Sequence, residues 1–413
     1  MKLANLEHKR ILIAGFGIEG MATKTFLETQ VPTARISTTD VSNGAEYLSQ
    51  QAEYDVVIKT PGIPARDLTV SYTTATNIFF ANLPTTIQTI GVTGSKGKST
   101  TASLIHHILE DSGKPVKLVG NIGTPLLSAF DPLDSKTLYV IELSSYQLAD
   151  IEYSPHISVI VSLFPEHIPY HGSVKKYYQA KKNILMNTSP KDYYVYNPLY
   201  PRLFHWAKEC KAQAIPYQAT IPQTSSRLIG LHNADNIRAA YTVSQLFHIV
   251  DTVFTSSVAT FQPLPHRLET IGTYQGITFI DDAISTTPES TIAALNAISD
   301  VATIFLGGED RGYNFSKLIE LLYEKQVENI VVFPDSGNRI AEELHIKYPN
   351  IFNIYHTQDM QSAVAYAFEH TPTGSVCLLS SASPSYSLWK NFQEKGNQFQ
   401  ACIHTHETQE KTH

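Results

Sequence analysis

The sequence contains only three cysteines, Cys210, Cys377 and Cys402, and no Cys-x-x-Cys pair. This scarcity argues against a disulfide framework and a thiolate zinc site, and it is typical of proteins from a reducing compartment.

Positive charge is also scarce: 31 Lys and Arg stand against 38 Asp and Glu, for a net charge of −7. Because general nucleic-acid binding depends on clustered basic residues, we expect no nucleic-acid partner.

Long hydrophobic runs are absent as well. No apolar run approaches the roughly 18 residues of a membrane span, and the chain begins with Met-Lys-Leu-Ala-Asn-Leu-Glu-His-Lys-Arg before a short apolar strand. We therefore expect a cytoplasmic protein with no membrane partner.

The sequence has enough hydrophobic residues to form several cores: 42% of its 413 residues are hydrophobic and 17% are charged. Its length and motif order predict three domains, over residues 1–85, 86–262 and 263–413.

The strongest motif is Gly-Val-Thr-Gly-Ser-Lys-Gly-Lys-Ser-Thr at residues 91–100, between an apolar run and apolar residues at helical spacing. A strand, glycine loop and helix in this order form a phosphate cradle, because backbone N–H groups and the helix dipole can surround the anion. Lys98 would reach the β- and γ-phosphates, and Ser99 would ligate Mg²⁺. The motif is atypical, since Val92 stands where G-x-x-x-x-G-K-[ST] has its first glycine and Gly94 replaces it. An ordinary Gly/Ser turn is the alternative.

A second glycine motif, Gly15-Phe-Gly-Ile-Glu-Gly20, follows a short apolar strand and precedes a helical segment. This G-x-G-x-x-G arrangement predicts a site for a nucleotide diphosphate, with Asp40 either on a ribose or merely in a loop. Thr60-Pro-Gly-Ile-Pro64 follows a further strand, at the edge where open α/β sheets bind ligands. Alone, the motif would also suit a nicotinamide-dependent oxidoreductase, which leaves the phosphate loop unexplained.

The middle of the chain carries candidate metal ligands. Glu142 ends an apolar strand, a position suited to Mg²⁺ in a domain with a phosphate loop. His167 and His171 lie with Glu166 in a loop that either binds metal or caps the next helix. That helix, over residues 174–185, has a lysine-rich face of the kind that is usually solvated.

The rest of the chain predicts further elements. Short strands and turns are expected over residues 192–231, and Asn233 and Asn236 share one face of the helix that follows. A proline-rich linker at 261–267 leads to a third α/β domain with strands at 277–281, 301–306, 329–333 and 376–379. Only the tail after Cys402 is expected to be disordered.

In this order the motifs resemble the Mur ligase family of ATP-dependent amide-forming enzymes over nearly the whole chain. The phosphate loop with Gly94 is that family's variant. Further family-like segments are Thr60-Pro-Gly-Ile-Pro64, Gly120-Asn-Ile-Gly123, His232-Asn-x-x-Asn236, His266-Arg267, Leu306-Gly-Gly308 and Lys390-Asn-Phe392. Segments 142–148 and 379–399 most resemble the members that join D-glutamate to UDP-N-acetylmuramoyl-L-alanine.

The resemblance implies an α/β fold with a Rossmann-like UDP-binding domain, a central P-loop ATPase-type domain, and a C-terminal Rossmann-like domain that binds the amino acid and part of ATP. In the implied reaction ATP phosphorylates the carboxylate of UDP-N-acetylmuramoyl-L-alanine, and the glutamate amine then displaces phosphate from the acyl phosphate. Such phosphoryl transfer needs positioning and cations more than covalent chemistry. We expect a monomer.

The resemblance also assigns residues to each site. The ATP site comprises Gly94, Ser95, Lys96, Gly97, Lys98, Ser99 and Thr100 with Asn233, Asn236, Arg267 and Asp282. The UDP-sugar site comprises Gly17, Ile18, Glu19, Gly20, Asp40, Thr60, Pro61, Gly62 and Asn121, and the glutamate site comprises Thr286, Arg311, Ser385 and Phe392. The catalytic residues are Lys98, Glu142, His167 and Lys181, and two Mg²⁺ ions are held by Ser99, Glu142, His167 and Lys181.

Lys181 matches the family's carbamylated lysine, with Lys182 as the fallback. An ammonium can only donate hydrogen bonds, whereas the carbamate formed with CO₂ is an anion that can ligate a cation. The catalytic residues implied by the resemblance, among them Lys98 and Lys181, argue against a catalytically silent relative that only binds UDP-muramyl precursors.

Three positions depart from the family pattern. The usual Asp-His-Leu-Asp loop reads Glu-His-Ile-Pro and ends at Pro169, and the usual Asp-Ser-Lys-Ala-Thr reads Asp-Ala-Ile-Ser-Thr, with Ile284 in place of a lysine. Arg311 stands where Lys is usual and can hold a carboxylate bidentately. A sister activity that adds L-glutamate would have much the same site, and the altered 282–287 segment leaves it open.

Overall fold

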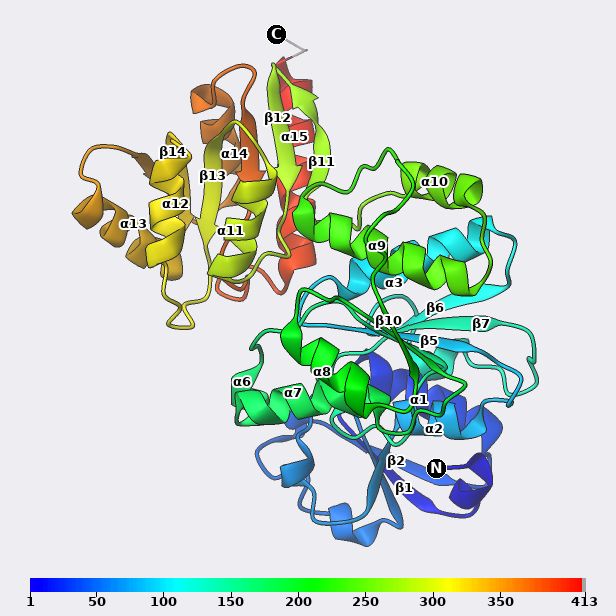
Figure 1. Cartoon of the computed structure of the whole chain (residues 1–413). Helices are drawn as coiled ribbons and strands as arrows, with labels where there is room; N and C mark the ends of the chain where they lie inside the picture. The colour runs from blue at the N-terminus through cyan, green and yellow to red at the C-terminus, as the bar shows by residue number, and fades with distance from the viewer. Residues whose placement is uncertain (411–413) are drawn as a thin grey trace. The chain divides into compact units, whose positions relative to one another are not determined.

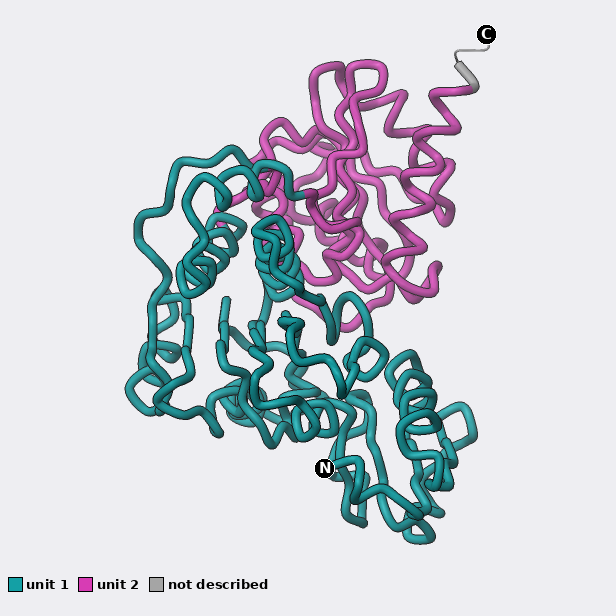
Figure 2. The backbone as a smooth tube through the Cα atoms, turned by 90° about the vertical axis from the view of Figure 1, so that its right-hand side faces the viewer, with its two compact units in different colours: residues 1–226, 232–261 teal, residues 227–231, 262–413 magenta. Residues whose placement is uncertain are grey.

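The computed structural model describes residues 1–410, which form two compact units. The first contains residues 1–226 and 232–261, and the second contains residues 227–231 and the chain from residue 262 (Figure 2). Three sheets flanked by helices confirm the predicted α/β class. The residue boundaries of three separate domains stay a prediction. No helix within residues 1–410 combines the length and apolar character that a bilayer crossing requires.

The first sheet is entirely parallel, with strand order β2-β1-β3-β4. Its elements are β1 (Arg10–Ala14), α1 (Ile18–Gln30), β2 (Arg35–Thr39), β3 (Val56–Lys59), β4 (Tyr72–Thr74) and α2 (Ala75–Asn82). The strand and helix predicted around the glycine motif at residues 15–20 are confirmed. Parallel order places the carboxyl ends of β1, β2 and β3 at one edge, where ligands of such sheets bind.

The second sheet is also parallel, with strand order β10-β9-β8-β5-β7-β6. Its strands are β5 (Thr89–Thr93), β6 (Val116–Gly120), β7 (Leu138–Glu142), β8 (Ile157–Ile160), β9 (Tyr193–Tyr196) and β10 (Gln213–Pro216). The helices of this part are α3 (Lys98–Asp111), α4 (Leu126–Ala129), α5 (Ser145–Leu148), α6 (Ile168–His171), α7 (Val174–Lys182), α8 (Pro201–Glu209), α9 (Leu231–Leu246) and α10 (Asp251–Thr260).

The first two sheets share one apolar core. Phe26 of α1 and Phe79 of α2 both pack on Phe130, with ring centroids 5.8 and 5.1 Å apart, and Phe79 also lies 5.1 Å from Tyr139 of β7. The Phe79 pairs are edge-to-face, an arrangement that adds to the free energy gained from burial. The core therefore contains residues from both sheets and from the helices that cover them within the first unit.

The third sheet has the order β11-β12-β16-β13-β14-β15, with β11 antiparallel to β12 and the other pairs parallel. Its elements are β11 (Glu269–Tyr274), β12 (Ile277–Asp281), α11 (Pro288–Ala297), β13 (Val301–Gly307), α12 (Ser316–Glu324), β14 (Asn329–Phe333), α13 (Ser336–Lys347), β15 (Asn353–His356), α14 (Met360–His370), β16 (Val376–Leu379) and α15 (Phe392–Glu410).

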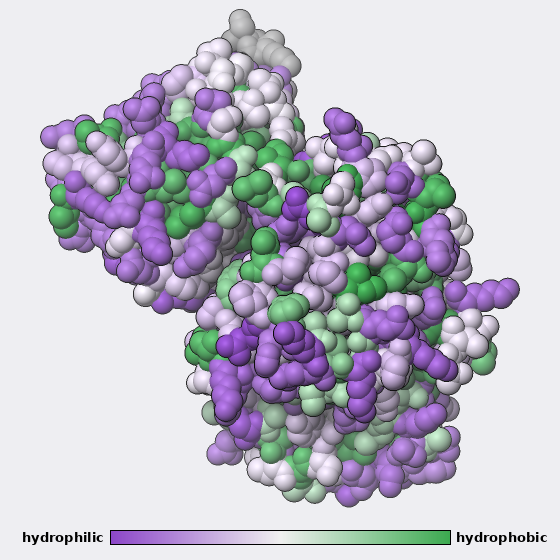
Figure 3. Space-filling view, viewed as in Figure 1, coloured by the Kyte–Doolittle hydropathy of each residue, from purple (hydrophilic) through white to green (hydrophobic). Residues whose placement is uncertain are grey.

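Alternate residues of the central strands enter different cores. Ile304 and Leu306 pack with α11, α12 and α13, whereas Phe305 packs with α14 and α15 on the opposite face (Figure 1). This alternation follows from the two-residue period of a strand. On the visible face of each unit, polar side chains are interspersed with smaller groups of apolar ones (Figure 3).

Two sequence-based expectations are wrong. The region 192–231 includes helix α8, which begins with Pro201 at its first turn and buries Leu203 and Trp206 on one face. The tail after Cys402 is helical to residue 410, because Phe399 and Ile403 are buried in the core beside α14; residues 411–413 lie outside the described chain.

Candidate active site

The glycine loop takes the predicted form between β5 and α3. Gly97 has φ 85° at the helix N-cap, a left-handed conformation that favours glycine. A Cβ on Gly97 would lie 2.5 Å from Asn236 Oδ1, and a Cβ on Gly94 would lie 2.5 Å from Val161. Lys98 Nζ donates to the carbonyl oxygens of Gly94 and Ser95, at 3.2 and 3.1 Å. The loop thus winds closely around the lysine at positions where a side chain would not fit, the form that a phosphate cradle requires.

Helix α9 brings both predicted asparagines beside this loop. Asn236 Oδ1 accepts a 3.1 Å hydrogen bond from Thr101 Oγ1 of α3, and Asn236 Nδ2 donates to Asn233 Oδ1 at 2.9 Å. Both asparagines are buried. Their helical spacing of three residues places them together, as the sequence predicted.

Glu142 ends β7, the neighbour of β5, and pairs in register with Val92. Its side chain is buried, and its Oε1 accepts a 3.0 Å hydrogen bond from Asn121 Nδ2. Its Oε2 is buried without a hydrogen-bond partner. Since an unpaired buried carboxylate oxygen is costly, this atom fits a hard divalent cation, for which oxygen is the preferred ligand.

Lys181 does not lie on a solvated face; its side chain is fully buried. Its Nζ donates to Gly94 O at 2.7 Å and Thr93 Oγ1 at 3.3 Å, and it lies 5.1 Å from the ring centroid of Tyr177. Burial, followed by the charge of Lys98, holds the pKa of Lys181 well below its ordinary value. The amine is thus biased toward the neutral, nucleophilic form. The prediction of a solvated lysine face on this helix is therefore wrong for Lys181, because this position of α7 faces the protein interior.

Part of the phosphate loop and Lys181 border one cavity of about 210 Å³. It is lined by Gly94, Lys98, Asn121, Ser144, Ser145, Tyr146, Glu166, His167, Tyr177 and Lys181. Burial lowers the pKa of His167, which leaves its ring neutral and able to ligate a metal. Three of the four predicted catalytic residues, Lys98, His167 and Lys181, thus line one cavity. The fourth, Glu142, accepts a hydrogen bond from Asn121, which lines the same cavity.

The two histidines of the 164–172 loop differ in surroundings. His171 Nε2 lies 3.0 Å from Ser145 Oγ, and its ring packs among Tyr146, Tyr170 and Tyr177. Burial lowers the pKa of His171 to about 4. His171 is therefore a packed, neutral histidine, whereas His167 faces the cavity.

The Glu-His-Ile-Pro segment at residues 166–169 and its neighbour Tyr170 contact two other loops. Glu166 Oε1 lies 3.1 Å from Lys96 Nζ of the phosphate loop. Tyr170, directly after Pro169, donates its hydroxyl to Pro61 O at 2.9 Å. This contact joins the loop to the strand-end turn at residues 60–64, and sequence reasoning did not find it because no motif marks Tyr170.

The predicted UDP residues of the first sheet meet at its carboxyl edge. Asp40 Oδ2 accepts from Phe16 N at 2.8 Å, so Asp40 supports the glycine turn. A Cβ on Gly15 would lie 1.9 Å from Thr60 Oγ1, which shows how closely the two turns approach. The turn segments 17–20 and 60–62 thus lie together, while Asn121 lies on the second sheet beside Glu142.

Glu19 points from α1 toward the second sheet. Gln147 Nε2 donates to Glu19 Oε2 at 3.4 Å, and Glu19 Oε1 is buried without a partner. Burial raises the pKa of Glu19 to about 7, against smaller opposing effects of Gln147 and Lys59.

In the second unit the predicted residues lie on the strand-end loops of the third sheet and at the start of α15. Asp282 is buried, and its Oδ2 accepts from Ser380 Oγ at 2.9 Å and from Ser285 Oγ at 2.5 Å. Burial raises the pKa of Asp282 to about 6. Ser385 Oγ is buried with no hydrogen-bond partner, which suits a site that receives a polar ligand.

The remaining predicted residues of this unit have clear neighbours. Arg311 Nε donates to Glu309 Oε2 at 2.8 Å, and its guanidinium lies 5.8 Å from the Tyr386 ring centroid. The Phe392 ring lies 6.2 Å from the His266 ring. Thr286 is half-buried in the loop after β12, and Arg267 follows His266.

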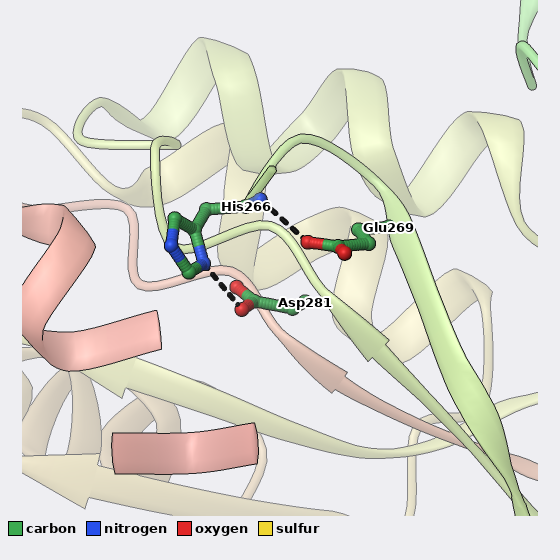
Figure 4. Close-up of side chains that lie close together, drawn as sticks. All are labelled: His266, Glu269 and Asp281. Carbon is green, nitrogen blue, oxygen red and sulfur yellow. Dashed lines mark hydrogen bonds and ion pairs between the residues drawn. The ribbon is translucent and has the colours of Figure 1, made fainter. Parts of the chain in front are cut away.

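His266, Glu269 and Asp281 offer ligand atoms within 4.8 Å of one another (Figure 4). Their hydrogen-bonding capacity is already used: His266 Nδ1 lies 2.7 Å from Asp281 Oδ2, and His266 N donates to Glu269 Oε2 at 2.8 Å. Gln400 Nε2 donates to both carboxylates. The cluster is best explained as a support for the His266-Arg267 turn.

Comparisons with known proteins agree with this geometry. The family model of the Mur ligase middle domain matches residues 92–223, and that of the Mur ligase glutamate ligase domain matches residues 266–383. A UDP-N-acetylmuramoyl-L-alanine–L-glutamate ligase of Micromonospora sp. is 32% identical, covering 98% of this chain and 98% of the relative. A UDP-N-acetylmuramoylalanine–D-glutamate ligase of Streptococcus mutans is 29% identical, covering 96% and 97%.

The fold is similar to that of the MurF ligase from Thermotoga maritima, solved in complex with ADP. The TM-score is 0.62 at 13% identity, with 98% of this chain and 97% of that chain covered.

Proposed function

The chain belongs to the Mur ligase family, and on that premise we propose that it joins D-glutamate to UDP-N-acetylmuramoyl-L-alanine with ATP in peptidoglycan precursor synthesis. The observation that carries the proposal is the cavity lined by Lys98, Asn121, His167 and Lys181, together with Glu142, which accepts from Asn121 and has its Oε2 buried and unpaired. It gathers the groups that a phosphoryl transfer to a carboxylate requires. The same proposal divides the chain into domains at residues 1–85, 86–262 and 263–413.

In the first step the terminal carboxylate oxygen of the substrate attacks the γ-phosphorus of ATP, and ADP leaves. The glycine loop would hold the phosphates through its backbone N–H groups and Lys98, while Asn233 and Asn236 would face the nucleotide. The remaining loop residues of the ATP site are Gly94, Ser95, Lys96, Gly97, Ser99 and Thr100. Arg267 and Asp282 would contribute from the second unit.

Mg²⁺ would be held by Ser99, Glu142, His167 and a carbamylated Lys181, and the donor set fits it because Glu142 Oε2 is buried and unpaired. When bound, the metal ions would neutralise charge that develops on the phosphoryl oxygens. Lys181 as an ammonium cannot ligate a cation. Its depressed pKa favours the neutral amine, which can add to CO₂ and lose a proton to give the carbamate.

In the second step the amine nitrogen of glutamate attacks the acyl carbon, phosphate leaves, and the nitrogen loses a proton. Arg311 and Ser385 would hold the carboxylates of glutamate, with Thr286 and Phe392 beside them. Support comes from the unpaired Ser385 Oγ and from the accessible guanidinium of Arg311. The UDP-sugar would lie against Gly17, Ile18, Glu19, Gly20, Asp40, Thr60, Pro61 and Gly62, with Asn121 near its reactive end.

One specific observation favours a second candidate, ligation of L-glutamate. The Micromonospora relative, which is 32% identical, is named for L-glutamate, while the Streptococcus mutans relative is named for D-glutamate. Phosphate release from ATP with UDP-N-acetylmuramoyl-L-alanine and each enantiomer separately tests both candidates. Release that needs only one enantiomer identifies the substrate.

A further inference from the structure

Lys395 is a fully buried lysine of α15 that the reaction above does not use. Its Nζ donates a short hydrogen bond to Ser381 Oγ and lies 5.9 Å from the Trp389 ring centroid. Burial lowers the pKa of Lys395 to about 7, while the nearby carboxyl groups of Asp281 and Asp282 oppose the shift. Because burying an amine is costly, such a residue needs a structural or functional reason.

The partner of Lys395 lies where two strand-end loops meet. Ser381 Oγ is 3.3 Å from Ser285 O in the loop after β12 and 3.2 Å from Ser383 O in the loop after β16. Ser383 Oγ in turn accepts from Ser336 Oγ at 2.7 Å, and Ser336 Oγ also lies 3.0 Å from Gly308 O. Lys395 is thus the outer end of a buried polar network that reaches the loops after β12, β13 and β16.

Close packing fixes the backbone beside Lys395. A Cβ on the next residue, Gly396, would lie 2.1 Å from His266 Nδ1 and 2.8 Å from Asp281 Oδ2. The start of α15 therefore packs directly against the His266–Asp281 pair, with the buried Lys395 next to this contact.

We propose that Lys395 is a positioning residue for the glutamate site, holding the loops after β12, β13 and β16 through Ser381. The inference rests on the proposed function, because these loops carry Thr286, Arg311 and Ser385. Lys395 reaches the 282–286 segment through Ser381, whose hydroxyl accepts from Lys395 Nζ and donates to Ser285 O.

The test measures KM for each substrate in the wild type, Lys395→Met, Lys395→Arg and the exposed control Lys325→Met. We expect Lys395→Met to raise KM for glutamate at least tenfold and to leave KM for UDP-N-acetylmuramoyl-L-alanine within twofold, since the latter is assigned to the first unit. Lys395→Arg retains a buried donor and recovers most of the loss. Equal effects on both substrates, or none on glutamate, overturn the inference.

Hydrogen–deuterium exchange gives a readout that does not depend on ligation. We expect faster exchange at residues 282–286 and 380–385 in Lys395→Met than in the wild type or Lys325→Met, and unchanged exchange there contradicts the proposal. If Lys395→Met does not fold, Lys395→Gln provides the same comparison. A wild type that shows no ligation overturns the proposed function instead, while the exchange result still decides the role of Lys395.

Discussion

Asn121 Nδ2 holds Glu142 Oε1 at 3.0 Å, so that the other carboxylate oxygen, Oε2, is buried and unpaired. The two residues come from the ends of adjacent strands, β6 and β7. The amide orients the carboxylate and leaves one oxygen available. An arrangement of this kind is costly without a ligand, which makes Glu142 the sharpest single indicator of a cation site.

Replacing this carboxylate tests the metal assignment. We expect Glu142→Gln to fold normally and to lose about 100-fold or more in phosphate release, the scale seen when one preorganised electrostatic group is removed. Nucleotide binding should also lose most of its dependence on Mg²⁺, measured by titration with and without the ion. Glu110→Gln, an exposed change at the end of α3, serves as control; an active, Mg²⁺-dependent Glu142→Gln would refute the assignment.

The phosphate loop makes an equally direct prediction. Lys98→Ala removes the cation expected at the β- and γ-phosphates, so turnover should fall by about 100-fold or more. Lys136→Ala, at an exposed loop of the same unit, should behave like the wild type. Steady-state phosphate release with saturating substrates measures both, and full turnover in Lys98→Ala would show that the loop has another purpose.

Lys181 and Lys182 of α7 allow the proposed role of a buried lysine to be compared with that of a surface lysine. Lys181→Ala should abolish activity and regain part of it with added short carboxylates, which replace the anionic carbamate. Lys182, which pairs at the surface with Glu209, should tolerate alanine with little effect. Activity of the wild type should also fall when CO₂ is removed. Absence of both the rescue and the CO₂ dependence would exclude carbamylation.

Glu19 predicts a pH dependence of stability. Its folded pKa is raised to about 7, above its unfolded value, so the fold favours the protonated acid. The resulting penalty is absent below the unfolded pKa, grows as pH rises, and is complete above about pH 7. Glu19→Gln should therefore stabilise the protein by about 1 to 3 kcal/mol at pH 8 and by much less at pH 5.

Urea unfolding of Glu19→Gln and the wild type at both pH values measures this difference. Glu28→Gln, at the exposed end of the same helix, should show no such trend. A Glu19→Gln variant that is equally or less stable at pH 8 would show that the buried carboxyl is ionised and satisfied.

Strand–loop–helix segments were the most predictable part of the protein. The glycine loops at 15–20 and 91–100 are local, and their backbone conformation follows from residues within ten positions. Tyr170 and Lys395 could not be found in the same way, because each bonds to a residue on another element. The partner of Tyr170 lies more than 100 residues away in the sequence, and Lys395 of α15 bonds to Ser381 in the loop after β16. Lys181 shows the same limit: a lysine-rich face predicts exposure, and only its contacts with Thr93 and Gly94, far away in the sequence, reveal the buried amine.

Ligation with the two glutamate enantiomers tests the central claim most directly. Purified protein is supplied with ATP, Mg²⁺, UDP-N-acetylmuramoyl-L-alanine and either D- or L-glutamate, and both phosphate and the amide product are quantified. The account predicts stoichiometric phosphate and product with D-glutamate. Product with L-glutamate alone would support the second candidate, and no product with either enantiomer would contradict the proposed function.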